Sequence, residues 1–147
     1  MITLREITRD NYVTCLNLKV SKEQESFVAP NTWSLAQSKY ETECIPLAIY
    51  KDDEMVGFLL YCIADFDNNY WIYRLMIDEK YQRKGYAYQA MLKLLEIITA
   101  DKNHNKIYID HHPDNIEANK LYSKLGFKKT DEFAKVDDFN IFMRYDY

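Results

Sequence analysis

Residues 82–87, with the sequence QRKGYA, combine two cations with a glycine in a chain that has only three glycines. They follow a run of β-branched and aromatic residues at 71–77 and precede a helical pattern, so we expect them at a helix N-terminus. Free backbone N–H groups and the positive end of the helix dipole suit such a place to a phosphate. Gly85 would let the backbone approach a ligand without a Cβ, and Ala87 keeps the next turn slim. The alternative is an ordinary strand-to-helix turn.

A second pattern lies in residues 115–127, NIEANKLYSKLGF. Asn115, Ala118 or Asn119, and Tyr122 fall at spacings that place them on one face of a helix two turns long. An amide and a phenol beside small residues indicate a groove for an extended ligand. The alternative is that Tyr122 is a core tyrosine whose hydroxyl finds a partner inside the protein.

Several short elements must position these two segments. The pattern of apolar residues predicts strands at 2–7, 46–51, 54–64, 71–77, 106–110, 127–133 and 139–145. Helices are expected from Asp10 to about Val20, from Asn31 or Thr32 onward, after Gly85, and from Asp114 or Asn115 to Gly126. The order is β-α-α-β-β-β-α-β-α-β-β, which predicts a mixed α/β sheet in one domain spanning residues 1–147.

Composition narrows the class of protein. The net charge is −4, but residues 71–130 carry 11 basic and 7 acidic residues while residues 1–70 carry 6 and 11. This distribution favours an anionic ligand in the middle section and disfavours nucleic acid as a partner. No apolar run reaches the ~20 residues of a membrane-spanning helix, and no signal peptide is visible. Three cysteines without metal-ligand spacing are expected to be core thiols of a cytoplasmic protein.

Together the two segments resemble the GNAT superfamily of N-acetyltransferases. Its acetyl-CoA loop, Q/R-x-x-G-x-G/A, is matched by residues 82–87, and its later N-x-x-A-x-x-L-Y-x-x-x-G-F is matched at every fixed position in residues 115–127. Residues 24–38 and 74–87 also resemble the bacterial spermine/spermidine acetyltransferases. The resemblance implies a mostly antiparallel sheet of about seven strands, with helices on both faces and a splayed central pair of strands.

The resemblance also implies the co-substrate and its site. Acetyl-CoA would lie in the wedge between the splayed strands, with its pyrophosphate on the loop and its pantetheine arm along the strand. The residues implied to bind it are Leu75, Met76, Ile77, Gln82, Arg83, Lys84, Gly85, Tyr86, Ala87 and Asn115.

In the family an amine attacks the acetyl-CoA carbonyl directly, and two protons must be handled. The resemblance places Tyr122 beside the thioester sulfur, where a phenol that is protonated at neutral pH can donate to the leaving thiolate. Many relatives carry a glutamate base on the strand before the loop, but Tyr73 and Arg74 stand there in this chain. Asp110 is one candidate base, and a chain of water molecules is the other.

The acceptor expected from the narrower resemblance is a polyamine, a small-molecule polycation. Four acidic residues on segments flanking the acceptor side are candidates to bind its ammonium groups: Glu23, Glu25, Asp65 and Asp67. Phe27 and Trp33 could line the site. His111 and His112 are neighbours on a strand and point to opposite faces, so no metal site is expected.

The alternatives left open are another amine acceptor, such as an amino acid, an aminoglycoside or a protein N-terminus, and a non-catalytic acyl-CoA-binding protein. A homodimer also remains open.

Overall fold

The computed structural model describes all 147 residues. The strands are β1 (Ile2–Glu6), β2 (Cys44–Lys51), β3 (Glu54–Ile63), β4 (Tyr70–Ile77), β5 (Lys106–His111), β6 (Lys128–Lys129) and β7 (Ile141–Asp146). The α-helices are α1 (Tyr12–Asn17), α2 (Asn31–Tyr40), α3 (Tyr86–Thr99) and α4 (Ile116–Leu125), and two 3₁₀ turns are η1 (Lys22–Gln24) and η2 (Glu79–Tyr81). The predicted order of strands and α-helices is confirmed.

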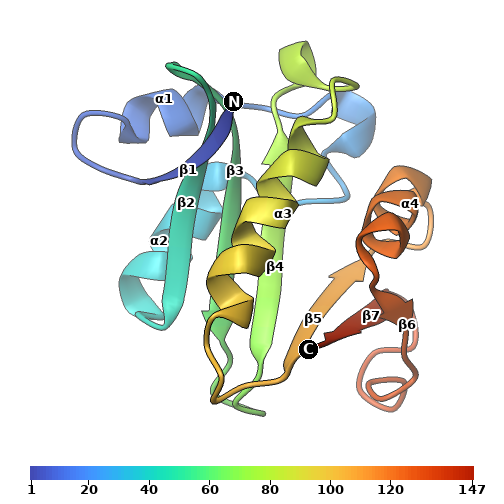
Figure 1. The fold of residues 1–147 in the computed structure, drawn as a ribbon. Coiled ribbons are helices and arrows are strands. Elements are labelled where there is room, and N and C mark those ends of the chain that lie inside the picture. Colours follow the sequence, from blue (N-terminus) through green and yellow to red (C-terminus); the bar gives the residue numbers. More distant parts are fainter.

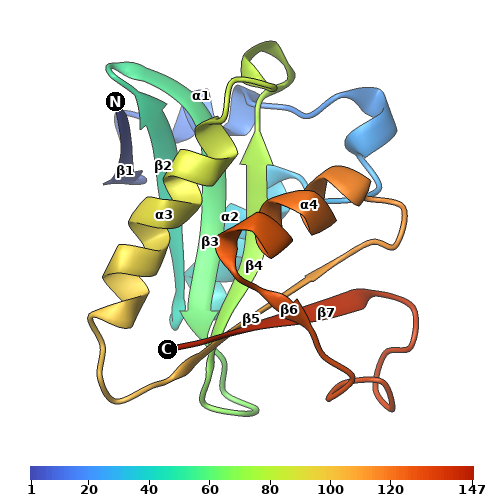
Figure 2. The same cartoon turned by 45° about the vertical axis from the view of Figure 1, so that its right-hand side comes forward.

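Seven strands form one sheet in the order β1-β2-β3-β4-β5-β7-β6, and every pair except β4–β5 is antiparallel. Helices α3 and α4 cover one face of this sheet, and α1 and α2 cover the other (Figures 1 and 2). Two apolar clusters correspond to these two layers, because Met91 of α3 belongs to one and Cys15 of α1 to the other. The expected fold class is therefore confirmed.

Strands β4 and β5 pair only over Tyr70–Ile72 and Ile107–Ile109, at the start of each strand. Beyond these residues the two strands diverge, and β5 turns away with β7 (Figure 2). A bulge lies at the same place, because Ile72 and Arg74 pair with consecutive residues of β3 and Tyr73 is left without a partner. A bulge bends its strand and increases the local twist. The sheet is thus open at its centre.

Several predicted boundaries are wrong, since β2 begins at Cys44 instead of residue 46 and β7 at Ile141 instead of residue 139. Asp10 does not begin the first helix, because Asn11 is the N-cap residue and its side chain accepts a hydrogen bond from the Thr8 amide at 2.7 Å. That helix ends at Asn17 rather than near Val20. The strand predicted at 127–133 is only two residues long, because its register with β7 ends at Lys129.

Helix α4 begins and ends where its capping residues predict. The Asn115 side chain accepts a hydrogen bond from the Ala118 amide at 3.1 Å, which satisfies one of the free N–H groups of the first turn. Gly126 ends the helix with φ 105°, a left-handed conformation in which a residue with a Cβ is strained. The two caps fix where α4 begins and ends.

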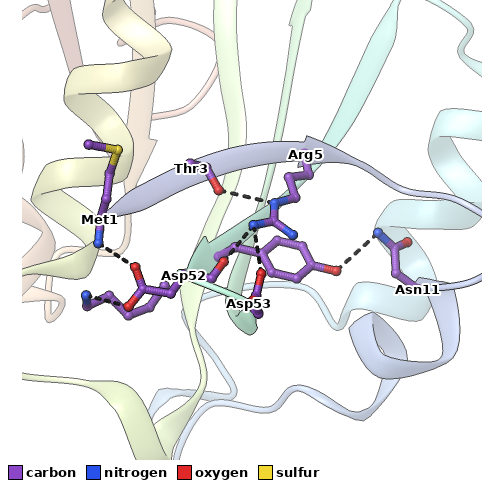
Figure 3. Close-up of polar contacts among 8 residues, drawn as sticks. Met1, Thr3, Arg5, Asn11, Asp52 and Asp53 are labelled. Carbon is purple, nitrogen blue, oxygen red and sulfur yellow. Dashed lines mark hydrogen bonds and ion pairs between the residues drawn. The ribbon is translucent and has the colours of Figure 1, made fainter.

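The edge strand β1 is held to the β2–β3 hairpin by charged contacts (Figure 3). The amino group of Met1 lies 2.9 Å from Asp52 Oδ1, and Arg5 donates to the Asp52 carbonyl at 2.6 Å. Asp52 lies in the turn between β2 and β3 and has φ 55°. These contacts lie at the sheet edge opposite the β5–β7 side.

No helix in the structure has both the length and the apolar character needed to cross a membrane. The three cysteines are free and buried, as core thiols are, and burial raises the pKa of Cys15 to about 11.

Candidate active site

The opening between β4 and β5 leads into a cavity of about 630 Å³. Residues 72–77 of β4 form one wall, residues 109–112 form the other, and α4 and the loop before α3 close one side. Residues 26–29, before α2, and Asn140, before β7, line it from the α1–α2 side of the sheet. The structure therefore brings both segments singled out in the sequence to one cavity.

The loop at residues 82–87 forms one end of this cavity. Gly85 is the N-cap residue of α3 with φ 80°, and Arg83 also has a positive φ of 63°. A Cβ built on Gly85 would meet nothing closer than the Gln89 side chain at 3.9 Å, so the space in front of it is open. The first N–H groups of α3 point out of the helix N-terminus here. This geometry fits the pyrophosphate of a nucleotide cofactor.

Most of the ten residues expected to bind the co-substrate line the cavity, and Lys84 does not. Gln82 is held by protein groups, since its Nε2 donates to the Ile77 carbonyl at 2.9 Å and to Gln24 Oε1 at 2.8 Å. The sequence did not indicate Gln24 as a site residue. Its hydrogen bond with Gln82 connects η1 to the loop. On the β5 side, residues 73–77 of β4 have no strand partner.

Tyr122 projects from α4 into the cavity wall and is 7% exposed. Its ring packs between those of His111 and Phe127, at centroid distances of 6.0 and 6.1 Å. No group of the protein forms a hydrogen bond with its hydroxyl, so the alternative of an internally satisfied core tyrosine does not apply. Burial raises the pKa of Tyr122 far above its usual value, and the negative charge of Asp110 adds to this shift. The hydroxyl is a proton donor over the whole neutral range.

Asp110 lines the opposite side of the same cavity, near the end of β5. Burial raises the pKa of its carboxyl group, while a hydrogen bond from Asn140 Nδ2 at 3.0 Å favours the charged form. Asn140 was missed by the sequence reasoning, because it joins the site only through the return of the chain along β7. Arg74 was noted only as a departure from the family, and it also lines the cavity.

The four acidic residues considered for the acceptor are spread out. Glu25 lines a smaller cavity of about 350 Å³, which adjoins the main one because both are lined by Val20, Val28, Ala29 and Met76. Glu23 lines neither cavity. Asp65 and Asp67 lie on the β3–β4 loop, outside both cavities, where Asp67 accepts a hydrogen bond from Trp71 Nε1 at 3.0 Å.

Of the two aromatic residues considered, Phe27 lines the main cavity and packs 5.2 Å from His112, whereas Trp33 is exposed on α2. The two histidines have different surroundings. His112 packs against Phe27, whereas His111 Nε2 lies 3.2 Å from the Asn119 side chain. The side chains of Glu41, Glu43 and Cys44 lie close enough together to hold a metal ion, but this group lies outside both cavities.

Comparisons with known proteins agree with this geometry. A family model described as the acetyltransferase (GNAT) family matches residues 3–127. The spermine/spermidine N(1)-acetyltransferase of Bacillus subtilis (strain 168) is 30% identical over 145 residues, which cover 95% of this chain and 93% of the relative.

Two solved structures each superpose with a TM-score of 0.77 at 18% identity, covering 99% of this chain and 95% of their own. One is a spermidine N-acetyltransferase from Vibrio cholerae in complex with CoA and spermine. The other is an aminoglycoside acetyltransferase in complex with coenzyme A and kanamycin. Enzymes with different amine acceptors share this architecture, so the fold alone leaves the acceptor open.

Proposed function

Because the chain belongs to the acetyltransferase (GNAT) family, we propose that it transfers the acetyl group of acetyl-CoA to a primary amine of a polyamine such as spermidine or spermine. The observation that carries the acetyl-CoA part is the opening of β4 from β5 into a cavity that ends at the Gly85 loop. The polyamine part is supported by the 30% identity to the B. subtilis spermine/spermidine enzyme over nearly the whole chain.

In this proposal the pyrophosphate binds the N-terminus of α3, where Gly85 leaves room and Arg83 supplies a cation. The pantetheine arm runs along Leu75, Met76 and Ile77, whose β5-facing backbone groups lack a strand partner and can pair with its amides. Backbone groups alternate in direction along a strand, and those of Met76 face β3, so the β5-facing groups are those of Leu75 and Ile77. The carbonyl of Ile77 already accepts from Gln82, so Leu75 and the Ile77 N–H supply most of this pairing.

The acceptor enters from the α1–α2 side, past Phe27 and Asn140. A protonated primary amine must lose two protons to become an amide. One goes to Asp110 and then to solvent before the nitrogen attacks the thioester carbon. The C–N bond forms and the C–S bond breaks, and the sulfur takes a proton from Tyr122, which regains one from the reacting nitrogen. Tyr122 and Asp110 differ widely in proton affinity, which suits them to act as the acid and the base of one site.

The remaining ammonium groups of a polyamine need negative charges along its path. Glu25 is the candidate best supported, because its cavity adjoins the main one. A single exposed charge pair contributes only ~0–1 kcal/mol, so several weak contacts must act together.

The proposal is tested by measuring CoA release with a panel of acceptors that share a butyl segment. Putrescine and spermidine should exceed butylamine, which has one charge, in kcat/KM, and 4-aminobutanoate should be a poor acceptor. The KM for spermine should rise steeply with salt, because charge attraction is screened over ~8 Å at physiological ionic strength. Glu25→Gln should raise the KM for spermidine, whereas Asp65→Asn, outside both cavities, should not.

Equal kcat/KM for butylamine and spermidine would refute the polyamine assignment and leave the acetyltransferase one in place. Preference for an amino acid or an aminoglycoside would identify another amine acceptor. Binding of acetyl-CoA without acetylation of any amine would indicate a non-catalytic binding protein.

A further inference from the structure

Arg74 is a half-buried arginine on the cavity wall that takes part in none of the ion pairs of the chain. Its guanidinium donates to the Tyr73 carbonyl at 2.9 Å and to Gln37 Oε1 of α2 at 3.3 Å, and both acceptors are neutral. The Nε atom is buried and has no partner. A desolvated cation without an ion pair is costly, so its position at the cavity calls for an explanation.

The bulge in β4 determines where Arg74 points. Tyr73 is the extra residue of this bulge, and its side chain packs in the cluster on the α1–α2 face. Arg74 faces the same side, because it bonds to Gln37 of α2. Without the bulge, adjacent residues would point to opposite faces of the sheet. The bulge therefore brings a cation to the acceptor side of the opening.

Asp110 faces that side from the other strand. Tyr108, two residues earlier on β5, belongs to the cluster on the α1–α2 face, and the period of a strand places Asp110 on the same face. Arg74 and Asp110 thus lie on opposite walls of the same cavity, without forming an ion pair with one another.

The charges around Asp110 oppose one another. Burial favours its neutral form, and the nearby carboxylate of Asp137, on the loop before β7, acts in the same direction. The Asn140 amide favours the charged form, and Arg74 from β4 acts in the same direction. Tyr122 faces it from α4 as a neutral phenol. Arg74 supplies the positive charge in this set.

We propose that Arg74 is a positioning residue that keeps Asp110 ionised in the partly desolvated cavity and so maintains it as the acceptor of the amine proton. This inference rests on the proposed function for its chemical role, but the electrostatic coupling can be measured without any acceptor. An incoming ammonium group would also be disfavoured beside the guanidinium, which aids release of its proton to Asp110.

The experiment titrates the Asp110 carboxyl carbon by NMR in the free protein and measures kcat/KM for spermidine from pH 5 to 9. The variants are Arg74→Gln, which removes the charge, and Arg74→Lys, which retains it. Arg9→Gln is the control, because Arg9 is exposed and takes part in none of the ion pairs. Asp110→Asn identifies the NMR signal and the limb of the pH profile that belongs to Asp110.

In Arg74→Gln, Asp110 should titrate at higher pH, and the acidic limb of the pH profile should move in the same direction, so that activity at pH 6 relative to pH 8 falls several-fold. Arg74→Lys should restore most of both values, and Arg9→Gln should match the wild type. If Arg74→Gln does not unfold cooperatively, Gln37→Leu, which frees the guanidinium from α2, should give a smaller shift of the same sign.

An unchanged titration of Asp110 in Arg74→Gln would overturn the inference, even if polyamines are acetylated. A shifted titration with no polyamine acetylation would instead overturn the proposed function and leave the coupling intact.

Discussion

At the scale of single residues, the chemistry proposed for this protein depends on proton donors and acceptors kept in unusual surroundings. Tyr122 is buried with its hydroxyl free of protein partners, and Asp110 lies across the cavity from an arginine with no ion pair. Each side chain is of an ordinary type, and its environment determines which protonation state it holds.

Tyr122→Phe should lower kcat by roughly 10²–10⁴, the usual scale for a positioned acid. The substitution keeps the ring that packs against His111 and Phe127 and removes only the hydroxyl. Steady-state kinetics should show an acetyl-CoA KM close to that of the wild type. Tyr40→Phe, at an exposed position on α2, is the control. A kcat within a few-fold of wild type would show that Tyr122 has a packing role and that water supplies the proton.

Two substitutions at Gly85 separate the effect of a negative charge from the effect of side-chain size. Asn tolerates the left-handed conformation better than most residues, so Gly85→Asn should be only mildly strained. Gly85→Asp has the same size but places a carboxylate beside the pyrophosphate. Its affinity for acetyl-CoA in calorimetry should be at least ~10-fold lower than that of the Asn variant. Equal acetyl-CoA affinities of the two variants would show that this loop does not bind the pyrophosphate.

At the scale of elements, the site depends on how α4 and β4 are held. Asn115 caps α4 and also lines the cavity, so a loss of activity on its substitution could come from either role. The two roles use different atoms of the amide, because the cap uses the oxygen and a hydrogen bond to the pantetheine carbonyl would use the nitrogen.

Substitution of Asn115 should separate the two roles. Asn115→Ala should lower the stability of the protein by about 0.5–2 kcal/mol, the usual cost of losing a cap. Asn115→Asp keeps the oxygen and should melt close to the wild type, yet it should bind acetyl-CoA more weakly because the amide donor is lost. Thermal melting and calorimetry measure the two effects, and full cofactor affinity in the Asp variant would exclude Asn115 from the binding site.

At the scale of the whole molecule, charge contacts at the sheet edge connect the start of the chain to the β2–β3 hairpin. The hydrogen bond from the Met1 amino group, followed by the contact with Lys51, lowers the pKa of Asp52. Its contribution to stability is therefore present above the unfolded-state pKa of ~3.9 and is lost as pH falls through the lower folded-state pKa.

Asp52→Asn should slightly lower the melting temperature at pH 7, and its difference from the wild type should shrink as the pH falls and Asp52 becomes protonated in the folded state too. Asn suits the positive φ of this turn position, so the comparison isolates the charge. A difference that does not shrink as the pH falls would assign the effect to turn geometry instead of to the ion pairs.

Much of the architecture could be predicted, because the patterns that encode it are local. Helix α3 was expected after Gly85, and the caps of α4 were identified from single residues. The prediction failed at 127–133, where a full strand was expected. Only Lys128 and Lys129 find a partner on β7, and strand pairing depends on a segment more than ten residues away.

The sequence by itself determined the family, the element order and the two segments that line the cavity, since spacing along a helix or loop brings those residues together without help from the rest of the chain. Only the tertiary structure decided that β4 and β5 separate after three pairs, that the bulge at Tyr73 brings Arg74 to a cavity that Asp110 also lines, and that Asn140 bonds to Asp110. These features arise from strand register and from contacts between distant segments, and a local pattern carries no information about which residues on separate strands will face one another across an opening.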